Sequence, residues 1–195
     1  GISGEQGFSS TFSLAGQKIQ TLRYGENPHQ KAAFYRDETA GPGTVGGAKQ
    51  LQGKELSFNN IVDIEAVLSL VQEFDKPAAV IVKHTNPCGV AIGDSLKEAY
   101  QRALAADEVS AYGGIVGLNR RIDKDTAEEL VKIFLEAVIA PSVDADALEV
   151  LAAKPNLRVL ECGEMNGEPG GFDLKKVSGG FLVQENDTGY VPPAE

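Results

Sequence analysis

The sequence predicts an α/β fold in which helices cover a mostly parallel, mixed sheet. Residues 78–82 form an unbroken apolar run rich in β-branched side chains, which is typical of a strand buried on both faces. Residues 60–74 carry apolar side chains at helical spacing. From there to residue 160, short apolar runs alternate with helical segments, as they do where crossover connections join parallel strands.

The other elements are predicted from local signals. Residues 1–18 are expected to be a linker or arm, and 37–47 and 161–173 to be loops. The 60–74 helix has Asn59 or Asn60 as its expected N-cap and Pro77 as its stop. Ser95 and Glu98 predict a capping box at the next helix. We expect further strands at 32–35, 113–118, 138–140, 157–160 and 181–184, a helix from 125 that turns Leu130, Ile133, Phe134 and Ala137 inward, and a helix over 144–153.

Composition and charge argue against several classes of function. The 195 residues are 42% hydrophobic and 24% charged, which is typical of a globular protein. With 18 Lys and Arg against 28 Asp and Glu, the net charge of −10 argues against non-specific binding to nucleic acid or to an anionic membrane. No apolar run is long enough to cross a membrane, and residues 1–13 lack the apolar core of a signal peptide, so we expect a cytoplasmic protein.

Residues 41–46 match the dinucleotide-binding fingerprint G-x-G-x-x-G literally. The fingerprint requires a strand that leads into it and a helix that follows it. Neither is predicted here, and Pro42 favours a surface turn. We therefore expect a loop and no dinucleotide site.

Both histidines of the chain lie in polar, turn-forming segments. The 83–89 segment follows the carboxyl end of the predicted buried strand, where open α/β sheets place ligands. A bend, for which Asn86 and Pro87 are suited, would let Lys83 and His84 face one ligand. His84 could then move a proton, and Lys83 could stabilise a developing negative charge. The alternative is a solvated loop with a chance Lys-His pair.

The segment around His29 also holds Arg23 and Tyr24. Arginine suits a phosphate group, and an aromatic ring can hold a heterocycle. The alternative is a simple turn nucleated by Gly25 and Asn27-Pro28.

Other chemistries lack their signatures. A zinc deaminase would need a glutamate two residues after its histidine and a second cysteine after Pro87-Cys88, and both are missing. Cys88 could pair with His84 as a thiol nucleophile, but no third group is evident to orient them. Cys88 and Cys162 make no disulfide framework. We therefore expect no catalytic metal.

Six blocks of the sequence carry a resemblance to a known family. They are residues 22–30, 53–60, 83–89, 110–114, 139–141 and 178–184, in that order. They resemble AICAR transformylase, the formyltransferase part of the bifunctional purine-biosynthesis enzyme that also carries IMP cyclohydrolase. The resemblance implies formyl transfer from the cosubstrate 10-formyltetrahydrofolate to the nucleotide AICAR. It also implies a three-layer α/β/α, cytidine-deaminase-like fold without zinc, used twice in tandem, of which residues 19–195 are similar to the first copy.

The resemblance also implies roles for single residues. His84 is expected to be the proton acceptor and Lys83 the lysine that stabilises the transition state. The expected substrate-binding residues are Arg23, Tyr24, His29, Gly113 and Glu136.

The family's active site also draws residues from its second copy and from a partner subunit, and its cyclohydrolase domain is expected on the N-terminal side. None of these fits within 195 residues. Two hypotheses follow. The chain is part of a formyltransferase that is active when the missing half is supplied, or it is a catalytically silent nucleotide-binding or subunit-association module. A half-domain should expose apolar surface, so we expect a homodimer or other self-association.

Overall fold

The computed structural model describes residues 8–165, 171–187 and 189, and its elements begin and end as follows. The strands are β1 Gln17–Leu22, β2 Ala32–Arg36, β3 Lys49–Gln52, β4 Ala78–Lys83, β5 Asn86–Ile92, β6 Ile115–Leu118, β7 Ala137–Ala140, β8 Arg158–Glu161, β9 Phe172–Val177 and β10 Gly180–Glu185. The helices are α1 Phe58–Val71, α2 Leu96–Ala106, α3 Glu108–Ala111, α4 Lys124–Leu130 and α5 Ala145–Leu151.

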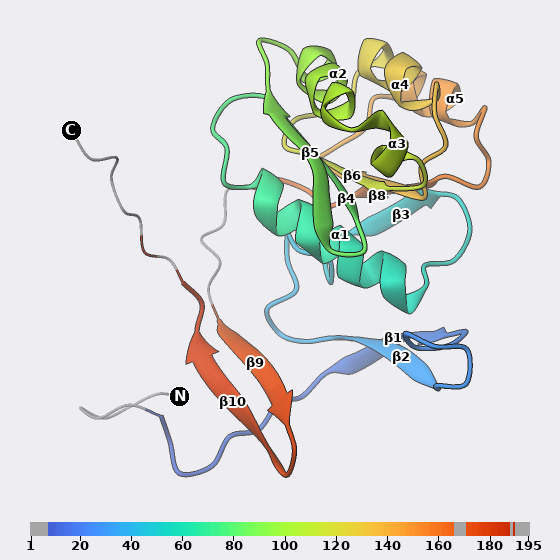
Figure 1. The fold of residues 1–195 in the computed structure, drawn as a ribbon. Coiled ribbons are helices and arrows are strands. Elements are labelled where there is room, and N and C mark those ends of the chain that lie inside the picture. Colours follow the sequence, from blue (N-terminus) through green and yellow to red (C-terminus); the bar gives the residue numbers. More distant parts are fainter. Residues whose placement is uncertain (1–7, 166–170, 188, 190–195) are drawn as a thin grey trace.

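A six-stranded sheet in the order β3-β8-β7-β6-β4-β5 forms the centre of the described part, and β1–β2 and β9–β10 form two separate two-stranded sheets (Figure 1). The predicted helix-covered α/β fold with a mixed sheet is confirmed. Parallel pairing is confined to β6–β7–β8, whereas β4 runs antiparallel to β5 and β6, and β3 runs antiparallel to β8. The sheet is therefore less parallel than the sequence predicts; of these antiparallel pairs, β4–β5 is a hairpin, whose strands must run in opposite directions.

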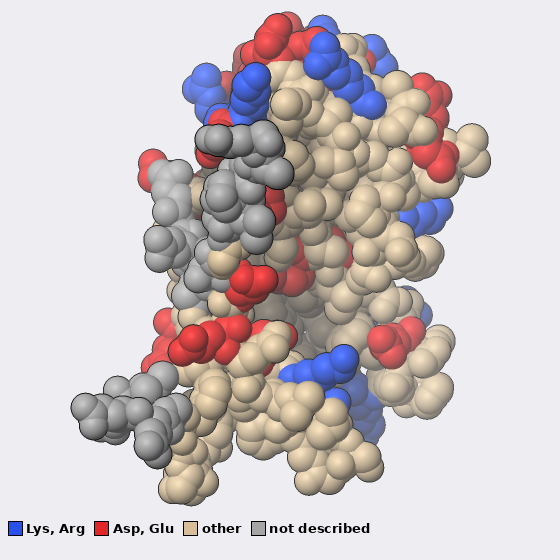
Figure 2. All heavy atoms as spheres, turned by 60° about the vertical axis from the view of Figure 1, so that its left-hand side comes forward, with Lys and Arg blue, Asp and Glu red and all other residues tan. Residues whose placement is uncertain are grey.

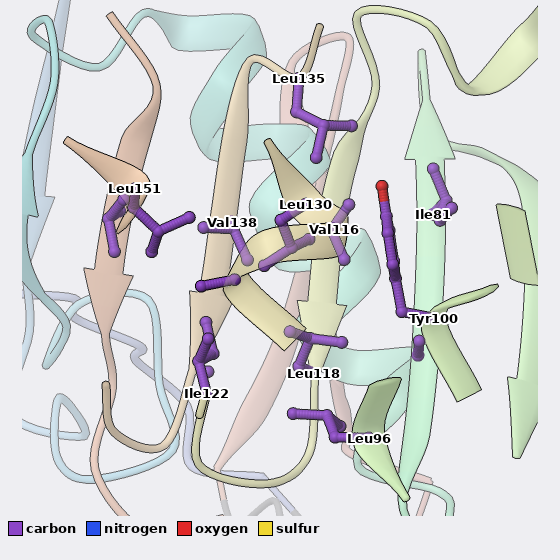
Figure 3. Packing of buried hydrophobic residues seen from close by; sticks show 14 of the residues in the cluster. Ile81, Leu96, Tyr100, Val116, Leu118, Ile122, Leu130, Leu135, Val138 and Leu151 are labelled. Atoms are coloured by element: carbon purple, nitrogen blue, oxygen red, sulfur yellow. The ribbon is translucent and has the colours of Figure 1, made fainter. Parts of the chain in front are cut away.

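Helices cover the two faces of this sheet and create two apolar cores. On one face α1 packs on β4, β6 and β7, and on the other α2 packs on β4 and β5 beside α4, which contacts α5 (Figure 1). β4 serves both cores in alternation: Ala79 and Ile81 join the α2 side, and Val80 and Val82 join the α1 side. Figure 3 shows Ile81, Tyr100 and Val116 packed together within the α2-side cluster. The unbroken apolar run of β4 thus reflects burial on both faces.

Helix starts follow side-chain caps. The N-cap of α1 is Ser57, so the predicted caps Asn59 and Asn60 are wrong. The Ser57 hydroxyl accepts from the Asn60 N–H at 3.1 Å, and the Asn60 side chain accepts from the Ser57 N–H at 3.1 Å. The Ser95 hydroxyl accepts from the Glu98 N–H as predicted, while the Glu98 carboxylate accepts from the N–H of Asp94.

The helix predicted from residue 125 is shorter than expected. Helix α4 begins after the Asp123 N-cap and ends at Leu130, so Ile133 and Phe134 lie beyond it and Ala137 belongs to β7. The chain leaves the helix because residues 134–136 bond along the sheet edge instead. The Phe134 carbonyl accepts from the Gly113 N–H at 2.8 Å, and the Glu136 N–H donates to the Gly114 carbonyl at 3.0 Å.

Four strands of the described residues, β1, β3, β5 and β9, lie where the sequence predicted none. β5 covers Asn86 and Pro87, where a bend was expected. β1 begins at the end of the predicted arm, of which residues 1–7 lie outside the described residues and 8–16 form no helix or strand. β3 and β9 are short or largely exposed, so they lack the apolar pattern that reveals a strand. The 41–46 segment joins two strands, which agrees with its exclusion as a dinucleotide fingerprint. Within the described ranges, no helix has both the length and the apolar character of a membrane span.

Candidate functional site

Lys83 and His84 lie where β4 reverses into β5. His84 and Thr85 are the two central residues of the reversal, with φ of 53° and 60°, and Lys83 pairs with Asn86 across it. Positive φ at both central residues is the pattern of a two-residue type I′ hairpin turn. The predicted bend therefore exists, but it lies at the 84–85 turn, and the chain from Asn86 onward is strand.

The 84–85 turn is strained. Among the described residues, His84 and Thr85 are the non-glycine residues with positive φ. This region is costly for any L residue and most of all for a β-branched one, at about 1–3 kcal/mol for each residue. Such outliers persist only where their surroundings hold them, so the contacts of this turn matter to its function.

Contacts from α1 and from the turn itself hold this conformation. The Asp63 carboxylate of α1 accepts from the Thr85 N–H at 2.7 Å and from the His84 N–H at 3.2 Å. The His84 carbonyl accepts from the Thr85 hydroxyl at 2.7 Å and from the Asn86 side-chain amide at 2.8 Å. The backbone polar groups of His84 are therefore bonded, while its side chain lies on the exposed tip.

The Lys83 side chain reaches the residue next to Gly113, another predicted site residue. Its half-buried ammonium group donates to the Tyr112 carbonyl at 2.8 Å, directly before Gly113. Gly113 has a φ of 75°, which favours glycine. Its N–H is engaged by Phe134, so a backbone contact from Gly113 to a ligand would have to come from its carbonyl group.

Glu136 lies on the same edge of the sheet. Its carboxylate accepts from the Arg158 guanidinium at 2.6 Å, and Arg158 also donates to the Glu55 carbonyl at 3.0 Å. The side chain of Arg158 is 12% exposed and that of Glu136 is 38% exposed, so the pair stands at the rim of the body. Lys83, Gly113 and Glu136 thus share one edge, formed by the end of β4 and the beginnings of β6, β7 and β8.

Arg23, Tyr24 and His29 lie in the connection between β1 and β2. The Arg23 guanidinium stands 5.8 Å from the centroid of the Tyr24 ring, and His29 is exposed. The Gly25 N–H donates to the Gln30 carbonyl at 2.8 Å, and the Gln30 N–H donates to the carbonyl of Asn27. The connection is therefore a closed turn, as the simpler alternative predicted, on which Arg23 and His29 are exposed.

The structure brings both segments to the N-terminal half of α1 without joining them. The Gln20 side chain of β1 donates to the Leu56 carbonyl at 3.0 Å just before α1, and Asp63 of α1 holds the 84–85 turn. In the described ranges, no hydrogen bond or ion pair links Arg23, Tyr24 or His29 to Lys83 or His84.

One cavity lies away from the Lys83–His84 pair. It has a volume of about 850 Å³ and runs between the 34–46 segment and the outer face of α1, where Ile61, Glu65 and the C-cap residue Gln72 line it. Figure 2 shows a hollow between the main body and the hairpins, with Asp and Glu side chains along its rim. A second cavity of about 140 Å³ is lined by residues 133–135 and 153–157. Lys83 and His84 line neither of these two cavities, and the His84 side chain is exposed.

Comparison with known protein families places this sequence. The model of the AICARFT/IMPCHase bienzyme family matches residues 2–195. The chain belongs to this family. It is a family of bifunctional enzymes of purine biosynthesis, and the match includes both predicted site segments.

In this AICARFT/IMPCHase member, the described residues contain no group of three His, Cys, Asp or Glu side chains that could hold a metal ion. Burial, reinforced by the Asp107 carboxylate, raises the pKa of the Cys88 thiol. A protonated thiol is a poor nucleophile, so Cys88 is not poised to attack a substrate.

Sequence reasoning missed two residues that contact the candidate site residues, Asp63 and Arg158. Asp63 lies in the apolar helix α1, and Arg158 begins a buried strand, so no local motif marks either. Their position beside His84 and Glu136 depends on contacts between elements that are distant in the sequence.

Proposed function

We propose that this chain is part of a formyltransferase that transfers the formyl group of 10-formyltetrahydrofolate to the 5-amino group of AICAR. Family membership supports the proposal. The observation that carries it is the strained 84–85 turn, which sets His84 beside a lysine anchored on the Tyr112 carbonyl. Strained residues held by several contacts are typical of functional sites.

The chemistry needs a base and a positive charge. The 5-amino group of AICAR is a poor nucleophile because its lone pair is delocalised into the ring. As this nitrogen attacks the formyl carbon, His84 accepts the proton that the nitrogen loses. The Lys83 ammonium group stabilises the negative charge on the formyl oxygen. The bond from the carbon to N10 of the folate then breaks, and N10 takes up a proton, which yields FAICAR and tetrahydrofolate.

The other predicted residues would bind the nucleotide. Arg23 is suited to the phosphate, with Tyr24 and His29 beside it. Gly113 would contact the substrate through its carbonyl group, and Glu136 would do so while it is oriented by Arg158. The reaction as proposed requires no catalytic metal and takes place in the cytoplasm.

The exposed position of His84 fits a site that is completed by other parts of the protein. In this proposal residues 19–195 are the first of two similar subdomains, and the second subdomain, a partner subunit and a cyclohydrolase domain supply the rest. The alternative is a catalytically silent nucleotide-binding or association module. Two observations support this alternative: His84 is exposed, and Lys83 lines neither of the two cavities described above.

An assay of formyl transfer from 10-formyltetrahydrofolate to AICAR tests the proposal, with the 195-residue chain alone and with the second subdomain added. We expect turnover that His84→Ala reduces at least about 100-fold, because general base catalysis contributes that much. Lys83→Met should also reduce turnover, whereas Lys175→Met, which removes an exposed lysine of β9, should not.

Calorimetric titration with AICAR separates the two hypotheses. AICAR binding without turnover, even with the second subdomain present, would support the silent module. Absence of both binding and turnover would contradict both hypotheses.

A further inference from the structure

We propose that Asp63 is a positioning residue whose carboxylate holds the 84–85 turn and so sets the place of the His84 imidazole. The proposal rests on the proposed function of His84 as the proton acceptor.

The Asp63 carboxylate joins α1 to the turn through both of its oxygens. Oδ1 accepts from the Thr85 N–H at 2.7 Å, and Oδ2 accepts from the His84 N–H at 3.2 Å. Hydrogen bonds to an ionised acceptor are about twice as strong as those between neutral groups. Two such bonds to consecutive N–H groups fix both the position and the orientation of the turn.

The turn needs this support because its own residues disfavour its conformation. Two-residue turns of this type favour Asn-Gly, whereas this chain has His84 and Thr85 with φ of 53° and 60°. The Thr85 hydroxyl and the Asn86 side-chain amide donate to the His84 carbonyl. The two N–H groups of the turn are therefore held by Asp63, a partner outside the hairpin.

Asp63 itself stands on a rigid element. Its neighbours Ile64 and Val67 are fully buried in the α1-side core. Because Asp63 lies on this helix, its hydrogen bonds fix the position of the 84–85 turn relative to α1 and the core. Supporting contacts of this kind set the geometry of catalytic groups.

Variants at Asp63, in the chain supplied with the second subdomain, test this role. We expect Asp63→Ala to lower kcat about 100-fold, since misplacement of a catalytic group by about 1 Å can have that effect. The KM for AICAR should change little, because both Asp63 carboxylate oxygens are engaged by the N–H groups of the turn. Asp63→Asn keeps one accepting oxygen and should show a smaller loss. Glu65→Ala is the matched control, because it removes a carboxylate from the same helix two residues further on.

Amide hydrogen exchange gives a readout that does not depend on turnover. In Asp63→Ala the His84 and Thr85 N–H groups should exchange faster, while those of the α1 core keep their protection. Glu65→Ala should leave all of them unchanged. Adding Thr85→Gly to Asp63→Ala should recover part of kcat, because glycine adopts positive φ without strain.

Unchanged exchange at His84 and Thr85 in Asp63→Ala would overturn the proposal, and so would a kcat equal to that of Glu65→Ala. If the unaltered protein shows no turnover at all, the proposed function fails. The exchange rates then still decide whether Asp63 holds the turn.

Discussion

Burial controls the chemistry of both cysteine thiols. Cys162 is 2% exposed, and its Sγ lies 3.3 Å from the Ala140 carbonyl oxygen. Burial raises the pKa of Cys162 from its ordinary value of 9.0 to about 11. Cys88 is half-buried, and burial likewise raises the pKa of its thiol. Neither group is a thiolate at neutral pH, so both act as small apolar side chains.

Cys162 should make the protein less stable as the pH rises above about 9. The unfolded chain loses this thiol proton near 9.0 and the folded chain only near 11, so between these values the folded state binds more protons. Stability conferred by the protonated thiol is therefore complete below pH 9 and is lost as the pH rises toward 11. Urea unfolding at pH 8, 9 and 10 should show a shallower decline for Cys162→Ala. Equal declines would contradict this assignment.

The β4–β5 hairpin illustrates how an element places a site. Ile81 pairs with Gly89 and Val82 with Pro87, so Cys88 is the extra residue of a bulge. Pro87 is tolerated because β5 is the edge strand and needs no N–H on its outer side. A Cβ at Gly89 would lie 1.9 Å from the Ala103 carbonyl oxygen of α2, which explains why glycine stands there.

Gly89→Ala should therefore destabilise the fold by about 3 kcal/mol, because the added methyl group would clash with the Ala103 carbonyl. This carbonyl belongs to helix α2 and could move only if the helix moved with it. For a chain of this size the melting temperature should fall by roughly 6–12 °C. Gly180→Ala in β10 is the matched control, since its Cβ would meet only Val177, at 3.8 Å. Thermal unfolding of both variants measures the difference, and similar melting temperatures would argue against close packing of β5 on α2.

Over the whole molecule the helices cover the sheet unevenly. α1 packs on β4, β6 and β7, while β5 lies beyond it at the edge (Figure 1). Gly89 and Ala91 of β5 face the α2 side, so Val90 and Ile92 alternate onto the α1 side, where they are 39% and 40% exposed. An apolar strip on an edge strand is a typical site of association.

We expect the chain to self-associate through this strip. Light scattering at increasing concentration should show species larger than the monomer. The double variant Val90→Ser and Ile92→Thr should lower the proportion of these larger species, because it removes apolar surface from the strip. Thr at position 92 is β-branched like Ile and so remains suited to a strand. Leu174→Ser, on the exposed face of β9, serves as the control. A monodisperse monomer of the unaltered chain would contradict the expectation.

Prediction from the sequence succeeded where the signal is local and failed where it is not. β4 and α2 were predicted because apolar spacing and a Ser95 cap lie within a few residues of each other. β3, with the sequence Lys-Gln-Leu-Gln, was missed because its place in the sheet depends on pairing with β8, more than a hundred residues away. The bend was predicted at Asn86-Pro87 and not at 84–85, because His-Thr carries no turn signal. The turn at 84–85 is held by hydrogen bonds to Asp63, which lies on another element.

The chain's own residues were enough to reveal an α/β protein, its family resemblance and the residue types that suit formyl transfer, because motifs and periodicity are short-range properties. Only the folded chain shows that Lys83 reaches Tyr112, that Asp63 holds the 84–85 turn, and that Arg158 pairs with Glu136. These contacts join elements whose neighbourhood is set by strand order and by packing on α1. Strand order and helix packing depend on the burial of both apolar cores. Each core is built from residues that are far apart in the sequence, so no short stretch of sequence predicts it.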